Sequence, residues 1–252
     1  MTQGVLRLIL CILPVVAAIS GEVIAATAST SPEVLIVQAD AAYAQRSDLS
    51  QAQAALQGYE QASSADPAGA EAYWKASRVA WWLGDHAARS ADKIRYFQKG
   101  IDAARVAIAR NPKGVEGHFW LAANEGSYGE AKGVLKSLFL VKPIRREMAV
   151  VLRLNDHFLG GGGYRVLGVV DYKVPGFAGG SKKRALEELN KALAIDPQDP
   201  FTHYYLAEYY RITGDKEKSR AELEVLRSLQ VPPDSQPELQ MLQQKAENVF
   251  GP

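Results

Sequence analysis

Small, larger and proline residues recur in one order at three places along the chain. In each, the residues at offsets 0, 4 and 7 share one helical face and a proline follows at offset 12. The three sets are Ala55, Tyr59, Ala62 and Pro67; Gly100, Ala104, Ala107 and Pro112; and Ala185, Leu189, Ala192 and Pro197. Small residues let two helices touch, and a proline ends a helix. The pattern therefore predicts three helices that each pack closely against a partner helix.

A partner helix is predicted upstream or downstream of each pattern. Residues 33–46 precede a helix over 50–65, residues 71–83 and 115–123 open the next two units, and residues 201–213 pair with 216–229. The last unit has the length of about 34 residues that is typical of a tetratricopeptide repeat. Residues 236–250 are expected to form one more helix that covers the open end of the array.

These elements predict an all-α fold. We expect a single tetratricopeptide-like domain over residues 29–252, an array of about four helix hairpins with a C-terminal capping helix. The interval from Pro112 to Pro197 is much longer than one repeat, so the third unit is expected to contain a non-repeat insertion at about 124–181.

The end of this insertion, residues 160–181, reads GGGGYRVLGVVDYKVPGFAGGS. Each glycine costs about 1 kcal/mol against alanine inside a helix, and Pro175 costs more. The stretch is therefore predicted to be a structured loop or a binding edge. Two interpretations stay open, a long surface connection between helices and a functional loop.

Charge and cysteine content narrow the classes of partner and compartment. The chain has 29 Lys+Arg against 28 Asp+Glu, a formal charge of +1, which gives no electrostatic reason to expect nucleic acid as a partner. Its one cysteine, Cys11, lies near the N-terminus, so no disulfide and no cysteine-based metal site are expected.

The first 28 residues read as a secretory signal. Arg7 is followed by an apolar run and then by small residues, which predicts cleavage after Ala25 or Ala28 and an exported, periplasmic protein. Cys11 lies too early in the apolar run for a lipoprotein cysteine. The alternative is a segment that stays uncut as an N-terminal anchor.

No catalytic constellation is apparent, so no enzyme, cofactor or metal site is expected. His86, His118, His157 and His203 have no metal-binding spacing and are interpreted as surface or packing residues. Ser181 can cap the helix that follows it, or that helix start can bind an anion. Aromatic residues of the predicted first helices either pack the repeats or stack on a ligand: Trp74, Trp81, Trp82, Trp120, Tyr204, Tyr205, Tyr209 and Tyr210.

Two segments resemble the T-component family of tripartite ATP-independent periplasmic (TRAP) transporters. They are HFWLAANEGSYGEAKGVLKSLFLVKPIRREM and GGGGYRVLGVVDYKVPGFAGGSKKRALEELNKALAIDPQDPFTHYYLAEYY. The resemblance implies a periplasmic accessory protein that associates with the solute-binding subunit of such a system. It also implies a homo-oligomer, such as a trimer, with a channel or groove in each subunit for a small hydrophobic or carboxylate-bearing ligand.

The resemblance also suggests residues for this site. Arg165 and Tyr164 are expected to contact a ligand, with Trp74, Trp120, Tyr172 and Lys136 as further candidates, and the loop is expected to be shaped by Gly168, Pro175, Gly176, Gly179 and Gly180. The alternative is a general tetratricopeptide scaffold for protein partners, with an open groove and no ligand of its own. The layout is more weakly similar to mitochondrial regulators of microtubule dynamics, against which the glycine-rich motif and the secretory N-terminus argue.

Overall fold

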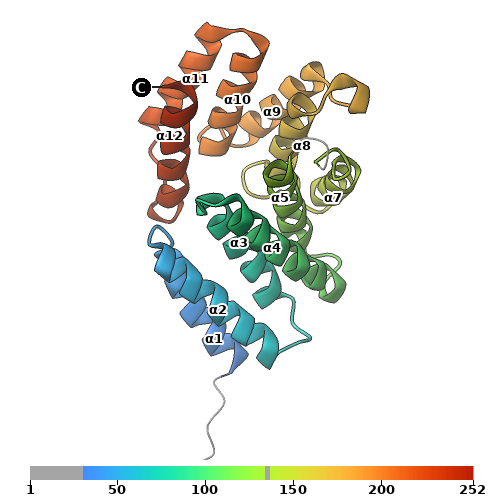
Figure 1. Ribbon diagram of the computed structural model, residues 1–252, viewed down its shortest axis with the longest axis vertical. Helices are drawn as coiled ribbons and strands as arrows, with labels where there is room; N and C mark the ends of the chain where they lie inside the picture. Colours follow the sequence, from blue (N-terminus) through green and yellow to red (C-terminus); the bar gives the residue numbers. More distant parts are fainter. Residues whose placement is uncertain (1–30, 134–136, 252) are drawn as a thin grey trace, which may run out of the picture.

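The computed structural model describes residues 31–133 and 137–251, and its regular elements are all helices (Figure 1). The predicted signal segment 1–28, with Cys11, and the candidate Lys136 lie outside the described residues. The helices are α1 (Pro32–Ala44), α2 (Leu49–Ala65), α3 (Glu71–His86), α4 (Ser90–Arg110), α5 (Val115–Lys132), α7 (Val141–Leu154), α8 (Gly162–Lys173), η1 (Gly176–Ala178), α9 (Lys182–Ile195), α10 (Pro200–Thr213), α11 (Lys216–Ser228), η2 (Pro233–Ser235) and α12 (Gln236–Phe250).

Short polar residues start several of these helices. The side chains of Ser31, Asp48, Ser181, Asp199 and Asp215 each accept a hydrogen bond from a backbone N–H of the first turn that follows. Such caps satisfy donors that have no partner within the helix. None of the helices in the described ranges combines the length and apolar composition that a membrane-spanning helix needs.

Consecutive helices pack in pairs, as the tetratricopeptide pattern predicts. The pairs are α1 with α2, α3 with α4, α5 with α7, α8 with α9, and α10 with α11. The small residues of the recurring pattern lie in these contacts, since Ala55, Ala104 and Ala185 are fully buried. The predicted fold class is confirmed, with five hairpins instead of about four.

The glycine-rich stretch differs from its prediction, because residues 162–173 form α8 rather than a loop. A Cβ atom on Gly168 would lie 2.8 Å from Leu189 Cγ and 3.1 Å from the carbonyl oxygen of Ala185 on α9. The glycine therefore permits close approach of α8 to α9, and its placement in a loop was wrong. The loop itself is confined to residues 174–181, where Gly179 has a φ of +92°.

The predicted insertion is also largely regular. Helix α5 continues past Asn124 to Lys132, α7 packs on α5, and α8 packs on α9, so the order of hairpins runs on through this region. One or two helices are predicted in the first part of the insertion, and α7 is one of them. It does not fit the recurring pattern because it ends at Leu154 without a proline after it, and it buries larger residues such as Met148.

Helix α12 joins the two ends of the array, instead of only covering an open end (Figure 1). Leu239 and Leu242 of α12 share one hydrophobic core with Tyr59 and Trp82 of the N-terminal hairpins and with residues of α10 and α11. The buried Arg46, just after α1, donates hydrogen bonds to the carboxylate of Glu238, with Nε 2.8 Å from Oε1. Lys245 Nζ lies 2.5 Å from Asp85 Oδ1. The array is therefore closed into a ring.

Candidate functional site

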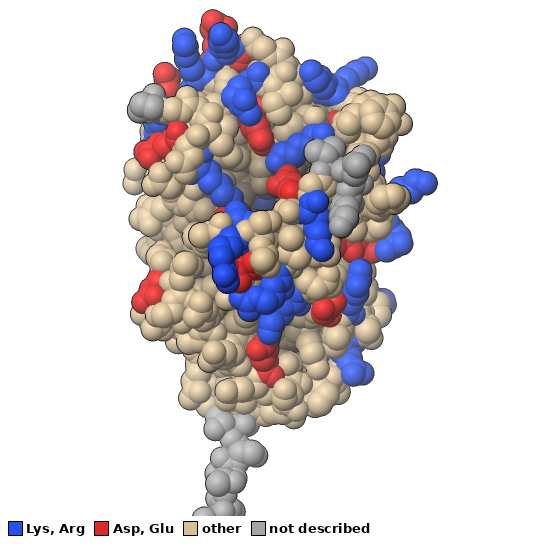
Figure 2. All heavy atoms as spheres, viewed as in Figure 1, with Lys and Arg blue, Asp and Glu red and all other residues tan. Residues whose placement is uncertain are grey.

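The ring encloses a cavity of about 1410 Å³, here called the central cavity. Figure 2 shows a hollow in one face of the molecule, rimmed by charged side chains of both signs. The lining comes from the first helices of the hairpins, α1, α3, α5, α8 and α10, together with α12 and the N-terminal end of α7. The first helices thus line the concave side, and of their aromatic candidates Trp81, Trp120, Tyr204 and Tyr205 line the cavity, whereas Trp74, Trp82, Tyr209 and Tyr210 do not.

Aromatic side chains form one part of this lining, the aromatic wall, which consists of Trp81, Phe119, Trp120 and Phe201. The ring centroid of Trp81 lies 5.9 Å from that of Trp120 and 6.2 Å from that of Phe201. Phe119 and Trp120 meet edge to face at 5.2 Å. Trp81 is fixed because its Nε1 donates to Ser127 Oγ at 3.1 Å. The wall is a preformed apolar surface for a ligand or a protein segment.

Carboxylates lie beside the aromatic wall. Lys173 Nζ of α8 is 2.7 Å from Glu130 Oε1 of α5 and 3.7 Å from Glu208 Oε2 of α10. Burial lowers the pKa of Lys173, but the attraction of Glu130 and Glu208 outweighs burial and raises it. The Tyr172 hydroxyl donates to Glu208 from outside the lining. Three helices thus present interacting charges to the cavity.

Another part of the cavity lining contains two arginines around one aromatic ring. The guanidinium carbons of Arg78 and Arg46 lie 3.9 Å and 4.6 Å from the centroid of Tyr43. Asp40 accepts a hydrogen bond from Lys75 at 2.7 Å, and Arg78 Nη2 lies 4.0 Å from the same carboxylate. Arg78 Nε is buried and makes no hydrogen bond to any described residue.

The residues expected to bind a ligand are only partly brought together. Trp120 and Arg165 line the central cavity, whereas Tyr164 and Tyr172 do not. Trp74 lies in a separate depression of about 290 Å³ beside Gly117. Ligand contact by any of these residues stays a prediction.

Arg165 is held by the protein itself. Its Nη1 lies 2.6 Å from Asp199 Oδ2, its guanidinium donates to the carbonyl oxygens of Leu159 and Gly160, and its carbon lies 5.4 Å over the ring of Phe201. The residue is only 5% exposed. These contacts tie α8 to the start of α10 and give Arg165 a structural role in the wall.

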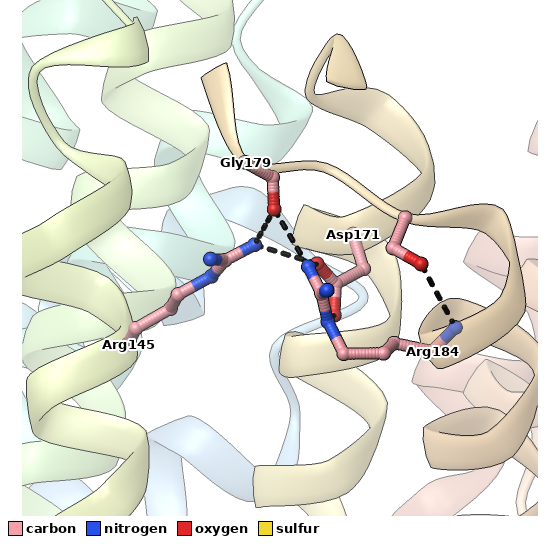
Figure 3. Close-up of polar contacts among 5 residues, drawn as sticks. Arg145, Asp171, Gly179 and Arg184 are labelled. Carbon is pink, nitrogen blue, oxygen red and sulfur yellow. Dashed lines mark hydrogen bonds and ion pairs between the residues drawn. The ribbon is translucent and has the colours of Figure 1, made fainter. Parts of the chain in front are cut away.

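Two arginines hold the loop that follows α8 (Figure 3). Arg145 from α7 and Arg184 from α9 both donate to the buried carboxylate of Asp171, at 2.5 and 2.8 Å, and both donate to the carbonyl oxygen of Gly179. Ser181 Oγ accepts from the backbone N–H of Arg184 at 3.3 Å, so Ser181 caps α9. The loop is thereby fixed, and the side chain of Phe177 within it is 90% exposed.

Several lining residues were not singled out from the sequence, although a signal was present. Glu208 follows Tyr204 by four positions, and Arg78 precedes Trp81 by three, so each lies on the same helical face as an aromatic candidate. In the described part of the chain, no group of three His, Cys, Asp or Glu side chains converges as a metal ion would require.

Comparisons with known proteins point to helical repeats. A family model described as Regulator of microtubule dynamics protein 1-3 matches residues 35–174, more than half of the chain, and a tetratricopeptide repeat model matches residues 188–221. The first match runs through Gly160–Gly163 and Gly168, so the glycine-rich stretch is compatible with that family, contrary to the expectation from the sequence. Curated proteins provide no match.

Solved structures resemble this chain at low sequence identity, and the first of the three named here shares its fold. The thermophilic TPR protein TTC0263 of Thermus thermophilus is 20% identical, with a TM-score of 0.62 over 84% of this chain and 97% of that chain. MamA is 13% identical, with a TM-score of 0.47 over 87% and 94% of the two chains. YrrB, described as a TPR protein with an unusual peptide-binding site, is 16% identical, with a TM-score of 0.43 over 86% and 91%.

Proposed function

The chain belongs to the regulator of microtubule dynamics protein 1-3 family, and from this premise we propose that it is a protein-interaction scaffold that holds an extended segment of a partner protein in its central cavity. Tetratricopeptide arrays offer their concave surface to partners. The observation that carries the proposal is the central cavity of about 1410 Å³, with its preformed aromatic wall on the first helices. The proposed role involves no catalytic step.

Size and charge of the cavity indicate the kind of segment. Sites for drug-sized molecules measure about 300–1,000 Å³, so the larger central cavity fits several residues of an extended chain. Its lining contains nine acidic and five basic residues beside the aromatic wall. This balance favours a segment that carries apolar and basic side chains.

A selection of random 12-residue peptides on the full chain tests the proposal. Gly126 lines the cavity, and a Cβ atom there would meet only Ile144 Cδ1, at 3.9 Å, so Gly126→Phe should place a ring in the cavity without a clash at the Cβ position. We expect selected peptides to bind the wild-type chain and to lose binding to Gly126→Phe. Phe177→Ala, altered on the outer loop, is the control that should bind normally. Purified tubulin belongs in the same assay because of the family's name.

Peptides that bind Gly126→Phe as well as the wild-type chain would contradict binding in the cavity. A selection that enriches no peptide, with Gly126→Phe and the wild-type chain equally inert toward tubulin, would contradict the scaffold function itself.

A second candidate function is that of an accessory component of a TRAP-type transport system. It is favoured by a cavity within one subunit whose wall contains Trp120 and Arg165, two residues expected from the resemblance. In this proposal the exported protein binds a solute-binding subunit in the periplasm, forms a homo-oligomer, and receives a small hydrophobic or carboxylate-bearing ligand. Native mass spectrometry of the full chain tests it. A trimer that releases small-molecule mass on unfolding is expected, and a bare monomer that fractionates with the cytoplasm would overturn it.

A further inference from the structure

Two tyrosines of α10 line the central cavity in addition to the four residues of the aromatic wall. Tyr204 and Tyr205 line the central cavity with Trp81, and their own ring centroids are 5.4 Å apart. Tyr204 is 8% exposed, yet its hydroxyl forms no hydrogen bond to any residue of the described ranges. The hydroxyl oxygen itself is not buried, so it is open to the cavity. This hydroxyl is therefore an unused polar group at the cavity surface.

Three carboxylates surround the same part of the cavity and only two ammonium groups oppose them. Asp85, Glu130 and Glu208 line it together with Lys173 and Lys245. Lys245 pairs with Asp85 at 2.5 Å and Lys173 with Glu130 at 2.7 Å, while Glu208 lies farther from Lys173, at 3.7 Å. Glu208 is the carboxylate with the weakest pairing to a cation.

The raised pKa values of Tyr204 and Tyr205 indicate that the electrostatic potential around them is negative. Burial, and then the negative charge of Glu208, raise the pKa of Tyr204 to about 12. Burial also raises the pKa of Tyr205, followed by the charges of Glu130 and Glu208. An anionic group at this place would meet the same repulsion that disfavours the two tyrosinates.

We infer that Trp81, Tyr204, Tyr205 and Glu208 form a binding site for a cationic side chain, a guanidinium or ammonium group carried by the partner's segment. Aromatic faces attract cations, and charge-assisted hydrogen bonds to a carboxylate hold them. The ammonium group of Lys173 already lies between Glu130 and Glu208, so the cavity accommodates a cation at this place. The inference rests on the proposed scaffold function and names the chemistry that its cavity recognises.

Two short peptides that differ only in charge test the site. The probes are acetylated and amidated Gly-Gly-Arg-Gly-Gly and the same peptide with citrulline, which has nearly the shape of arginine but no charge. Binding to the full chain is followed by calorimetry and by the NMR signals of the tryptophan indoles. We expect the arginine peptide to bind about tenfold more tightly than the citrulline peptide.

Glu208→Gln should remove this preference, because it deletes the charge and keeps an oxygen for the Tyr172 hydroxyl. Glu224→Gln, the same change on an exposed position of α11, is the matched control and should keep the preference. Tyr204→Phe removes only the unused hydroxyl, and we expect it to weaken the arginine peptide by a few fold. It also provides a test if Glu208→Gln does not fold.

Equal affinity for the two probes, or a preference that survives in both Glu208→Gln and Tyr204→Phe, would overturn the cationic site. The two proposals can fail separately. Selected 12-residue peptides that bind in the cavity without Lys or Arg would overturn the site and leave the scaffold function standing. Discrimination between the probes with no 12-residue binder would support the site and contradict the scaffold.

Discussion

The hairpins α5/α7 and α10/α11 contain the same arrangement of a histidine and its partners, although the connections between their two helices differ in length. In each, a buried histidine lies six residues after a proline and its Nε2 is close to that proline's carbonyl oxygen. The distances are 3.0 Å from His118 to Pro112 and 2.9 Å from His203 to Pro197. The other ring nitrogen, Nδ1, reaches a glutamate on the second helix of the hairpin at 2.7 Å in both cases.

The two hairpins differ in the length of chain between histidine and glutamate. His203 and Glu222 are 19 residues apart, with only Gly214 and Asp215 between their helices, whereas His118 and Glu147 are 29 residues apart, across residues 133–140. The contact is nevertheless the same, since the entropy of closing a loop grows slowly with its length. Hairpin α5/α7 is therefore a repeat with a long connection between its helices rather than a non-repeat insertion.

The largest expected effect comes from deleting the two histidines. His118→Ala leaves Glu147, at 9% side-chain exposure, with only the exposed Arg146 as a partner. His203→Ala leaves Glu222, at 19% side-chain exposure, without its histidine. We expect each variant to lower the free energy of unfolding by about 2–4 kcal/mol. Urea unfolding monitored by circular dichroism measures this loss. His157→Ala, on a side chain that is 71% exposed, is the control and should change little.

If the arrangement has the same role in both hairpins, the losses for the two variants should agree within about 1 kcal/mol, and the double variant should be additive because the two sites share no partner. A loss confined to His203→Ala would show that α5/α7 is not an equivalent repeat.

A smaller effect is expected at two helical glycines, one on each side of the long connection. Gly168→Ala brings a methyl group to 2.8 Å from Leu189 Cγ and 3.1 Å from the carbonyl oxygen of Ala185, so we expect a loss of about 1–3 kcal/mol in the free energy of unfolding. Gly126→Ala, also inside a helix, meets only Ile144 Cδ1 at 3.9 Å and should be neutral or stabilise by up to about 1 kcal/mol. Thermal unfolding of the two variants separates close packing from helix propensity. Equal effects would mean that Gly168 is not a packing contact.

Helices α7, α8 and α9 show how far the sequence alone predicts the fold. Regular hairpins are predicted by local sequence patterns. The spacing from Ala185 to Pro197, for example, predicts one face of a helix and the point where that helix ends. Helix α7 lacks the recurring small residues and a terminal proline, so its apolar positions predict a helix within the insertion but not the second helix of a repeat. The glycines of α8 predict a loop because each destabilises a helix relative to alanine, yet residues 162–173 are helical. The close approach that Gly168 permits offsets this cost, and only the neighbouring helix shows it.

The candidate site was predictable only in part for a related reason. The first helices and their aromatic residues follow from the repeat, which placed Trp120 in the wall. Closure of the ring depends on contacts such as Arg46 with Glu238, 192 residues apart, and on small rotations that accumulate over five hairpins. No local pattern contains these long-range contacts, so the sequence places Glu208 on the same helical face as Tyr204 but does not predict which helices enclose the cavity.

The smallest expected effect is a pH dependence of the regular hairpin. Both ring nitrogens of His203 face oxygens that only accept hydrogen bonds, so the imidazolium form alone can donate to Pro197 and Glu222 together. Burial lowers the pKa of His203, but the hydrogen bond with Glu222, and then that with the Pro197 carbonyl, outweigh burial, and the pKa is raised above 6.5. The folded chain therefore holds this proton more tightly than the unfolded chain does.

The sign of the effect follows from this difference. The stabilisation is full below pH 6.5, the value for an unperturbed histidine, and is lost as the pH rises through the higher value of the folded state. The stability difference between wild type and His203→Gln should thus be larger at pH 6 than at pH 8.5, by up to about 1 kcal/mol. Urea unfolding at both pH values measures it, with the exposed Glu224→Gln as a control whose difference stays constant. A difference that grows toward pH 8.5 would mean that the neutral imidazole is the form that the hairpin favours.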